Sequence, residues 1–497
     1  MQKELSALEH NQTWVLATLP NDKQAVDCKW VFKIKHHSDG TIERYKARLV
    51  AKGFTQVEGI DYHDTFAPVV KMTTVRCVLA VASFRKWPLY QLDVNNAFLH
   101  GLLDEDVYMK LPPGFYPQAR RSGLVCKLQR SIYGLKQASR QWFSRLSDAL
   151  IEFGFVQSLN DYSLFTLTTN GEFLILLVYV DDVVITGTSS DLIGRVKQFI
   201  HDKFQIKDLG HLKYFLGLEV ARCAAGIFLN QRKYVIDILD EYQFTDCKPA
   251  KSPMETKHGL SLSSAPLLPD ASVYRRLVGR LIYLTITRPD LAFPVHVLSQ
   301  FMQSPNEDHL RAAHRVLRYI KLAPAQGLLF PSNSPLQLTA FCDADWASCP
   351  TTRRSVSGYC MMLGSSIVSW KTKKQIVVAR SSAESEYRAL AGACGEILWL
   401  VRLLADMQVI VPTPVSIYCD NQAAIHIARN PVFHERTKHI EIDCHFVRYH
   451  VNAGSVFPTS ICTADQPADL FTKPLSADRL TYLSSKLGVS NFLHCPT

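Results

Sequence analysis

Two adjacent aspartates stand between apolar runs near the middle of the chain. Residues 173–180 are all aliphatic or aromatic, Asp181 and Asp182 follow, and residues 183–185 are aliphatic again. The pattern predicts a strand, a tight turn and a second strand, with both carboxylates at the tip of the hairpin. Adjacent carboxylates repel each other and are costly beside apolar strands unless a cation neutralises them. Magnesium, which binds a few carboxylates together with phosphate oxygens, is the natural partner, although a lone Asp-Asp pair is more often a solvated turn.

A third aspartate makes the solvated turn the poorer interpretation. Asp93 lies at the end of the apolar strand expected at residues 90–94. Residues 179–182 (Tyr-Val-Asp-Asp), with an upstream aspartate at a strand end, resemble the palm of reverse transcriptases. The resemblance implies that Asp93, Asp181 and Asp182 hold two Mg²⁺ ions. One ion would lower the pKa of the primer 3′-hydroxyl, and the other would steady the triphosphate leaving group.

Three further segments carry the same resemblance in the expected order. Phe98 stands where the family places an aromatic ring that would collide with a nucleotide 2′-hydroxyl, so it would select deoxynucleotides. Residues 134–138 resemble the segment whose glutamine touches the incoming nucleotide, which nominates Gln137. Residues 215–220 resemble the primer-grip hairpin. The residues nominated for the primer grip are Phe215, Leu216 and Gly217.

Upstream, residues 28–35 and 44–50 are expected to pair like two fingers strands, with a turn at Asp39 and Gly40. Their basic side chains are candidates to face the triphosphate, and a solvated strand charge is an equally good interpretation of each one singly. The candidates are Lys35, Lys46 and Arg48. The wording of residues 46–56, 91–101 and 133–137 resembles the copia-type retrotransposon enzymes in particular.

A second set of acids lies near the C-terminus. Asp343 ends an expected strand at residues 338–343, and Asp420 ends another at residues 415–420. Two acids at the ends of neighbouring strands, with a glutamate opening a helix between them in sequence, form the start of another two-metal cluster. This arrangement resembles ribonuclease H, which cuts the RNA strand of an RNA/DNA hybrid.

Two ligands of this second cluster have rivals. The family's glutamate precedes a bulky residue, any residue and alanine, a pattern that favours Glu386 over Glu384. The fourth ligand matches Asp469 in the run 466–469 (Gln-Pro-Ala-Asp), with Asp465 nearby. Each acid alone is more often a helix cap or a surface group. The nearby histidines have no cysteine at zinc-ligand spacing, which disfavours zinc and leaves substrate contact or plain surface. These histidines are His439, His445 and His450, of which His450 is the best placed to approach the site.

The segments that would position these residues show strand periodicity in some places and helical periodicity in others. Short β-rich runs alternate with helical spacing, as at Trp142, Phe143, Leu146 and Leu150, which indicates an α+β fold. Segments 251–269 and 324–335 are rich in Ser, Pro and Ala and are the best boundary candidates, with three helices expected between them. After residue 335 strands come first and a strand–helix alternation follows, which predicts a separate α/β domain.

Together with the resemblance, this predicts an α+β polymerase with the right-hand architecture of fingers, palm and thumb, followed by an α/β ribonuclease H-like domain. The expected ranges are 13–225 for fingers and palm, 226–334 for a mostly helical thumb or connection, 335–480 for the ribonuclease H-like domain and 481–497 for a C-terminal tail.

The composition limits the number of domains and the class of protein that this chain can be. A chain of 497 residues, 47% of them apolar, has material for two or three cores, and its net charge of +10 attracts polyanions. Thirteen scattered cysteines without a C-x-x-C pair suggest neither a disulfide framework nor a thiolate zinc site, so a reducing intracellular setting is expected. The N-terminus does not read as a secretory signal, and no apolar run approaches the ~20 residues that cross a bilayer. A cytoplasmic particle or the nucleus is the expected location.

The resemblance implies an RNA-directed DNA polymerase with ribonuclease H activity and two Mg²⁺ per active site. Its implied partners are an RNA template, a DNA primer, deoxynucleoside triphosphates and the RNA/DNA hybrid, with the integrase and capsid of the same element as further partners and no membrane. Because no protease or integrase signature is present, a processed product, a fragment or a degenerate copy is expected. The alternatives are a non-catalytic relic that binds nucleic acid, and a cellular ribonuclease H with an unrelated N-terminal module.

Overall fold

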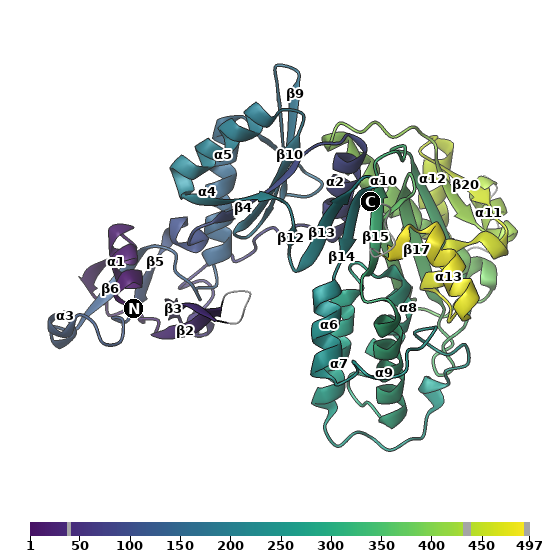
Figure 1. Cartoon of the computed structure of the whole chain (residues 1–497), viewed down its shortest axis with the longest axis horizontal. Helices are drawn as coiled ribbons and strands as arrows, with labels where there is room; N and C mark the ends of the chain where they lie inside the picture. Colours follow the sequence, from purple (N-terminus) through teal and green to yellow (C-terminus); the bar gives the residue numbers. More distant parts are fainter. Residues whose placement is uncertain (37–40, 431–438, 492–497) are drawn as a thin grey trace. The chain divides into compact units, whose positions relative to one another are not determined.

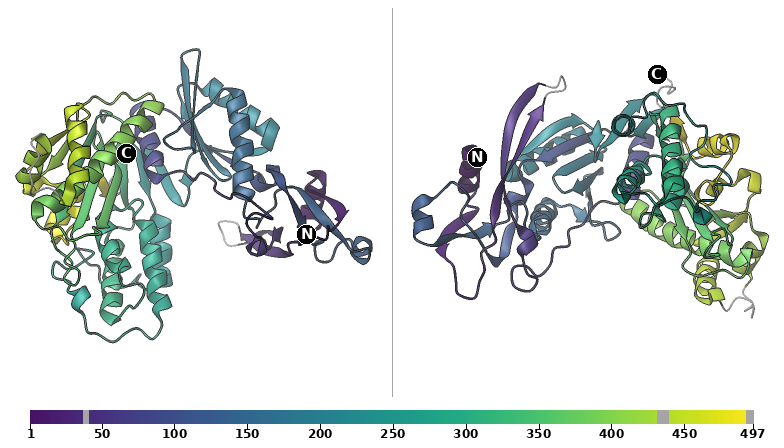
Figure 2. Two further views of the ribbon diagram at one scale, coloured as in Figure 1. Left: turned by 180° about the vertical axis from the view of Figure 1, so that it is seen from behind. Right: turned by 90° about the horizontal axis from the view of Figure 1, so that it is seen from below.

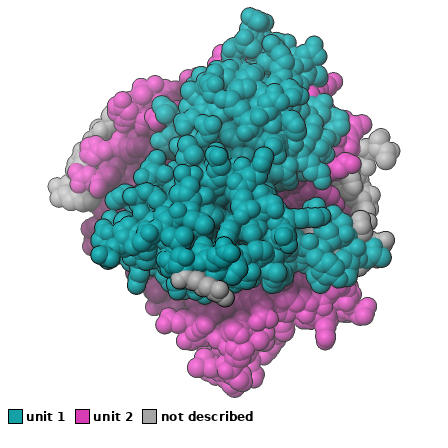
Figure 3. Space-filling view, turned by 90° about the vertical axis from the view of Figure 1, so that its left-hand side faces the viewer, with its two compact units in different colours: residues 1–70, 89–211 teal, residues 71–88, 212–497 magenta. Residues whose placement is uncertain are grey.

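The computed structural model describes residues 1–36, 41–430 and 439–491 and divides the chain into two compact units. Unit 1 comprises residues 1–70 and 89–211, and unit 2 comprises residues 71–88 and 212–497 (Figure 3). The chain therefore contributes one helix, α2 (Met72–Phe84), to unit 2 before it returns to unit 1. In the part of the chain that the structure describes, no helix has both the length and the apolar character needed to span a membrane.

The largest sheet of unit 1 has six strands in the order β11-β4-β10-β9-β8-β7, with every neighbouring pair antiparallel. Its strands are β4 (Leu89–Val94), β7 (Val156–Gln157), β8 (Leu164–Thr169), β9 (Glu172–Tyr179), β10 (Asp182–Gly187) and β11 (Ile206–His211). Helices α4 (Ala138–Phe153) and α5 (Ser190–Phe204) pack on this sheet (Figure 1). Their apolar faces, including Trp142 and Leu146 of α4 and Val196 of α5, complete one core with the strands. The hairpin expected at residues 173–186 is confirmed as β9 and β10.

Two smaller sheets complete unit 1. The first has the order β1-β6-β5, and the second is the ribbon of β2 and β3, which projects as a long two-stranded element (Figure 2). The remaining elements of unit 1 are α1 (Gln2–His10), β1 (Trp14–Thr18), β2 (Cys28–His36), β3 (Ile42–Ala51), η1 (Gly53–Thr55), η2 (Ala97–His100), β5 (Leu102–Met109), α3 (Pro117–Arg121) and β6 (Leu124–Arg130). The expected pairing of the two basic strands is confirmed, and the turn expected at Asp39 and Gly40 lies outside the described residues.

One of the two sheets in the described part of unit 2 is antiparallel and has five strands in the order β12-β13-β14-β15-β21. Its strands are β12 (Tyr214–Phe215), β13 (Leu218–Cys223), β14 (Gly226–Asn230), β15 (Gln326–Pro331) and β21 (Val489–Asn491). Segment 324–335, a boundary candidate because of its turn-forming composition, contains strand β15. The apolar residues Leu328 and Phe330 are buried between two partner strands, and that long-range pairing outweighs the local turn composition.

The chain segment that connects β14 to β15 forms several helices, and these pack against one another (Figures 1 and 2). They are α6 (Arg232–Glu241), η3 (Leu260–Leu262), α7 (Ala271–Leu284), η4 (Pro289–Leu291), α8 (Ala292–Ser299) and α9 (Glu307–Leu322). The three helices expected after residue 270 are confirmed, with a 3-10 turn opening the second. The expected range limit at residue 225 lies in the turn between β13 and β14, which pair with each other.

The C-terminal sheet of unit 2 has the order β18-β17-β16-β19-β20. The first three strands in sequence pair antiparallel, whereas β16, β19 and β20 are parallel, which confirms the predicted α/β pattern of strands first and strand–helix alternation later. Its elements are β16 (Leu338–Asp345), β17 (Val356–Leu363), β18 (Ser366–Lys374), α10 (Ser382–Asp406), β19 (Val415–Cys419), α11 (Gln422–Arg429), α12 (Glu441–Asn452), β20 (Val456–Ser460), η6 (Thr463–Asp465), η7 (Pro467–Phe471) and α13 (Ala477–Lys486).

A buried ion pair joins the helices of unit 2 to β15. Arg288 and Asp290 are 1% and 0% exposed, with Nη2 and Oδ2 separated by 2.7 Å. The same oxygen accepts hydrogen bonds from the Tyr319 hydroxyl at 2.8 Å and from Gln326 Nε2 at 3.4 Å. One carboxylate therefore connects η4, α9 and β15.

We predict that Asp290→Ala destabilises unit 2 by about 3–5 kcal/mol, because it leaves the Arg288 charge buried without a counter-ion. Urea denaturation followed by tryptophan fluorescence would measure the loss. The matched control is Asp237→Ala, which breaks the exposed pair with Lys233 and should cost less than about 1 kcal/mol. Equal losses in the two variants would contradict this account of the buried pair.

Candidate active sites

The strand register of unit 1 brings the three expected polymerase aspartates together. In the antiparallel pair of β10 and β4, Asp182 lies directly opposite Asp93. Asp181 precedes β10, and its carbonyl oxygen accepts a hydrogen bond of 2.9 Å from the backbone N–H of Val94. Facing residues on antiparallel strands have Cα atoms about 4.5–5.5 Å apart. The three carboxylates therefore share one end of two adjoining strands.

The electrostatics of this end favour a bound cation. Partial burial, together with the charge of Asp181, raises the pKa of Asp93, and the charges of Lys207, Lys46 and Arg48 oppose the rise. Burial also raises the pKa of Asp182, and the hydrogen bond of 3.2 Å from Gln91 Nε2 opposes it. Oxygen donors with unfavourable mutual repulsion are the set that a hard divalent ion neutralises, so these residues fit magnesium.

A tryptophan holds the turn that presents the aspartates. Val180 has a φ of +53°, which is unfavourable for a β-branched residue. Its carbonyl oxygen accepts a hydrogen bond of 2.6 Å from Trp142 Nε1 of α4. Trp142 is 1% exposed, so the indole packs in the core while its N–H reaches the turn. In the sequence, Trp142 is marked only by its place in a helical pattern, and the one further signal is that a buried indole needs an acceptor.

The second set of acids is also gathered in one place. Asp343 on β16, Glu386 on α10 and Asp469 on η7 are 1%, 5% and 5% exposed. Ligand atoms of Glu386, Cys419 and Asp420 lie within 4.8 Å of one another. Burial, followed by the charge of Asp343, raises the pKa of Glu386 to about 10, and burial raises the pKa of Asp343 to about 6. Carboxylates whose charged form is disfavoured by burial and by one another fit divalent cations as well.

One positive side chain already stands inside the second cluster. Lys473 Nζ lies 3.0 Å from Asp343 Oδ1 and 2.7 Å from Asp469 Oδ1. Arg479 Nη2 lies 3.2 Å from the other oxygen of Asp469, and the Thr472 hydroxyl donates to Asp343 Oδ2. Lys473 was not among the candidates from the sequence. The structure shows that its ammonium bridges two of the four carboxylates.

Comparison with known proteins identifies the family. Residues 11–256 match the family described as "Reverse transcriptase (RNA-dependent DNA polymerase)". The retrovirus-related Pol polyprotein from transposon RE1 of Arabidopsis thaliana is 45% identical over 491 residues, 99% of this chain and 33% of that protein. The putative transposon Ty5-1 protein YCL074W of Saccharomyces cerevisiae is 34% identical over 299 residues, 60% of this chain and 97% of that protein. The chain belongs to the copia-type retrotransposon Pol family.

This chain spans about a third of the length of the first Pol polyproteins it matches. Among solved structures, a foamy viral protease–reverse transcriptase in complex with double-stranded DNA aligns with 96% of this chain and 71% of that chain. Its identity is 11% and its TM-score 0.24, a value too low to support a comparison of folds.

The residues of this Pol chain that were expected to contact the nucleotide lie in different environments. Phe98 is half-buried in η2 and meets the Tyr133 ring edge-on at 5.2 Å, while the Arg48 guanidinium lies 4.3 Å from the same ring. Lys46 and Arg48 both act electrostatically on Asp93, which places them in the same neighbourhood as the catalytic candidates. The Lys35 side chain lies outside the described residues.

The hydrogen bonds of Gln137 differ from those expected of a residue that contacts the incoming nucleotide. It is fully buried at the start of α4, where its Oε1 accepts from Gln56 Nε2 at 3.0 Å and its Nε2 donates to the Asp61 carbonyl at 3.0 Å. Contact with a nucleotide would require Gln137 to give up these bonds. In this conformation the glutamine therefore ties α4 to the loop that precedes α2.

The primer-grip candidates form the tight turn between β12 and β13 in unit 2. Leu216 and Gly217 both have positive φ, +54° and +72°. The Tyr283 hydroxyl donates to the Leu216 carbonyl, and a Cβ at Gly217 would lie 2.5 Å from that hydroxyl oxygen. The hairpin expected here is confirmed, and only glycine fits the second turn position.

The rivals for the second cluster have other partners. Glu384 Oε2 accepts from the backbone N–H of Arg380 at 2.9 Å, as in a helix cap, and Asp465 pairs with Lys486 at 2.5 Å. Within the described residues, the metal-competent group contains Glu386, Cys419 and Asp420 and no histidine. Cys419 was not foreseen; its Sγ lies 3.8 Å from Glu386 Oε2, which adds a soft donor beside the carboxylates.

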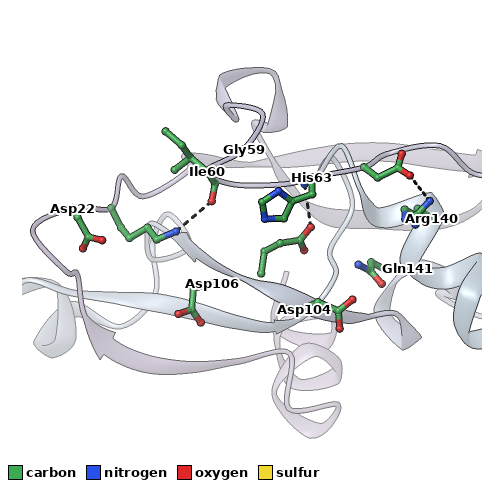
Figure 4. A pocket seen from close by; sticks show the side chains of 11 residues that line it. Asp22, Gly59, Ile60, His63, Asp104, Asp106, Arg140 and Gln141 are labelled. Carbon is green, nitrogen blue, oxygen red and sulfur yellow. Dashed lines mark hydrogen bonds and ion pairs between the residues drawn. The ribbon is translucent and has the colours of Figure 1, made fainter.

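A hollow of about 750 Å³ in unit 1 is lined by side chains of both charges (Figure 4). Arg140 pairs with Asp64 at 2.7 Å, and Lys23 Nζ donates to the Ile60 carbonyl at 3.2 Å. Its described lining shares no residue with the three aspartates of the polymerase site. Acidic side chains outnumber basic ones in its described lining, so the hollow does not suit an anionic substrate such as a nucleoside triphosphate.

We predict that Trp142→Phe lowers the free energy of unfolding of unit 1 by about 1–3 kcal/mol, because the Val180 carbonyl loses its donor. The displaced turn should also lower kcat for primer extension with little change in the KM for nucleotide. The control, Trp30→Phe, removes an indole donor to the Pro113 carbonyl instead. Wild-type kcat in Trp142→Phe would rule out a positioning role for this hydrogen bond.

Proposed function

We propose that this Pol chain is an RNA-directed DNA polymerase joined to a ribonuclease H that cuts the RNA of RNA/DNA hybrids. The observation that carries the polymerase is the facing of Asp93 and Asp182 at the end of two strands, with Asp181 in the turn between β9 and β10. The observation that carries the nuclease is the second cluster of four acids. Membership in the family supports the first activity directly, and the second follows from the site chemistry.

In the polymerase site, Asp93, Asp181 and Asp182 would hold two Mg²⁺ ions. Bound ions there lower the pKa of the primer 3′-hydroxyl and neutralise the triphosphate. The chain's own residues prepare that site: Trp142 fixes the turn and Gln91 orients the Asp182 carboxylate.

Residues around the polymerase aspartates would bind the nucleotide. Lys46 and Arg48 carry the positive charge that attracts the triphosphate. The Phe98 ring, braced by Tyr133, would occupy the space that a ribonucleotide 2′-hydroxyl needs. Primer DNA would contact the turn of Phe215, Leu216 and Gly217.

In the nuclease site, Asp343, Glu386, Asp420 and Asp469 would hold two divalent ions that activate water and steady the departing 3′ oxygen. Asp343 and Asp469 could hold a cation only if the Lys473 ammonium, which hydrogen-bonds to both, moved away. The Thr463 hydroxyl, which donates to Asp420 Oδ2 at 2.9 Å, keeps that carboxylate oriented. The 2′-hydroxyl and the shape of the hybrid would distinguish the RNA strand.

The substrates in this proposal are an RNA template, a DNA primer, deoxynucleoside triphosphates and the resulting hybrid. The reaction would take place inside the cell, in a cytoplasmic particle or the nucleus, with the integrase and capsid of the same element as partners. A relic that binds nucleic acid without catalysis is the weaker alternative, because all seven candidate carboxylates are retained in the sequence.

We predict that Asp182→Asn lowers primer extension by several orders of magnitude while RNA cleavage in a labelled hybrid persists, because the amide no longer holds a cation. Asp420→Asn should do the reverse. Both activities are measured on one hybrid substrate with Mg²⁺. Loss of both activities in either variant, with circular dichroism unchanged, would contradict the assignment of two separate sites.

We predict that Phe98→Ala increases ribonucleotide incorporation relative to deoxynucleotide by on the order of 10–100-fold, because the ring's bulk excludes the 2′-hydroxyl. Single-nucleotide incorporation against an RNA template measures the ratio. The control is Tyr108→Ala, which removes an aromatic ring from β5 elsewhere in unit 1. An unchanged ratio in Phe98→Ala would remove this residue from the nucleotide site.

A further inference from the structure

A groove beside α10 lies outside the carboxylate cluster, and it is here named the β17–β18 groove. It is a hollow of about 430 Å³ between strands β17 and β18 and helix α10, and its lining includes none of the four acids. Ser357 and Tyr359 of β17 pair in register with Lys373 and Lys371 of β18. Alternate residues of a strand face the same side, so the two lysines line the groove together.

Two glycines keep the α10 wall of this groove open. Gly392 and Gly395 lie in the middle of a 25-residue helix, where each costs roughly 0.5–1 kcal/mol relative to alanine. A Cβ at Gly395 would meet nothing within 4 Å, and one at Gly392 would meet the Tyr359 ring at an ordinary 3.5 Å. Packing therefore requires neither glycine. The cost is explained if the wall must stay clear for a ligand.

Basic side chains outnumber acidic ones in the described lining of the groove, where Lys371, Lys373, Lys374 and Arg388 stand against Glu396 and Asp443. Glu396 accepts hydrogen bonds from Ser369 at 2.6 Å and from Tyr359 at 3.4 Å, and Asp443 lies 3.6 Å from Arg388. Lys371 and Lys373 are exposed and form no ion pair with any described residue. Two exposed ammonium groups on one face of a strand pair are complementary to successive phosphates.

A residue that lines the same groove, Gln375, holds a buried acceptor without a donor. Gln375 is 8% exposed, and its Nε2 donates to Ser357 Oγ at 2.8 Å and to the Ser385 carbonyl at 3.0 Å. The carbonyl can only accept, so the orientation of the amide is fixed. Gln375 Oε1 is left buried without a hydrogen-bond partner among the described residues. A ligand that brought a donor would satisfy this oxygen, and beside phosphates a sugar hydroxyl is such a donor.

We propose that the β17–β18 groove binds a strand of RNA by its backbone, with phosphates against Lys371 and Lys373 and a ribose 2′-hydroxyl donating to Gln375 Oε1. This deepens the proposed function and rests on it only in the choice of RNA as ligand. The groove would hold the strand beside α10, the helix that also carries Glu386. Binding here needs no metal ion.

The test measures binding of a fluorescent single-stranded RNA to the full chain by anisotropy, in EDTA. The charge variant is Lys371→Ala with Lys373→Ala, and its matched control is Lys251→Ala with Lys257→Ala, an equal change of charge at exposed positions of unit 2. The charge variant should weaken binding about tenfold and reduce the slope of log affinity against log salt by about 1.4. The control should change affinity by less than about twofold.

Two further measurements separate the contacts. Gly395→Met should fill the groove, raise helix propensity and so keep the fold, and lower RNA affinity as much as the charge variant. DNA of the same sequence should bind several-fold more weakly than RNA to the wild type, because it lacks the donor for Gln375. Wild-type affinity in both the charge variant and Gly395→Met would overturn the proposal, and equal affinity for RNA and DNA would overturn the Gln375 contact.

Activity assays distinguish this proposal from the function on which it rests. If the wild type extends a primer while the groove variants bind RNA normally, the groove proposal alone fails. If the wild type neither extends primers nor cleaves hybrids, yet the groove variants lose RNA affinity, the proposed catalysis fails and the groove stands.

Discussion

Bringing several carboxylates to the ends of neighbouring strands is the constraint on which both candidate sites depend. Each carboxylate loses water and gains a like-charged neighbour, and both effects raise the pKa values of Asp93, Asp182, Asp343 and Glu386. Such clusters persist only where the surrounding fold fixes the strands and a cation offsets the charge. The apolar sheet beneath Asp182, the indole of Trp142 and the bridging ammonium of Lys473 are the parts that meet these two conditions.

The two sites meet the charge requirement in different ways. Around Asp93 the charges of Lys207, Lys46 and Arg48 only oppose the rise in pKa that burial and Asp181 cause, so a divalent ion would relieve the remaining repulsion. In the second cluster Lys473 contacts Asp343 and Asp469 directly, and Arg479 contacts Asp469 as well. Divalent ions would therefore enter the first site by neutralising repulsion and the second by replacing an ammonium group. If the second cluster holds divalent ions, their binding is coupled to movement of Lys473, a residue that a bare ligand list would omit.

Hydrophobic periodicity and turn residues predicted the strands and helices that short-range sequence determines. The apolar run before Asp181 forms β9, the basic strands pair as expected, and the order of strands and helices after residue 335 follows the prediction. Such patterns could not predict contacts between residues that are far apart in sequence. Strand β15 is concealed in a segment of turn-forming residues because its partners, β14 and β21, lie far away in sequence. The hydrogen bond from Trp142 to Val180, the burial of Gln137 and the bridge made by Lys473 likewise join residues that no spacing rule connects. The candidate acids themselves were predicted, and their supporting side chains were not.

If the carboxylate clusters are built to hold divalent cations, Mg²⁺ must bind the folded chain more tightly than the unfolded chain. Differential scanning calorimetry in increasing MgCl₂, against NaCl of matched ionic strength, tests this claim most directly. The account predicts that Mg²⁺ raises the unfolding temperature above the NaCl control in a saturable manner, without nucleic acid. Identical unfolding profiles in the two salts would contradict it.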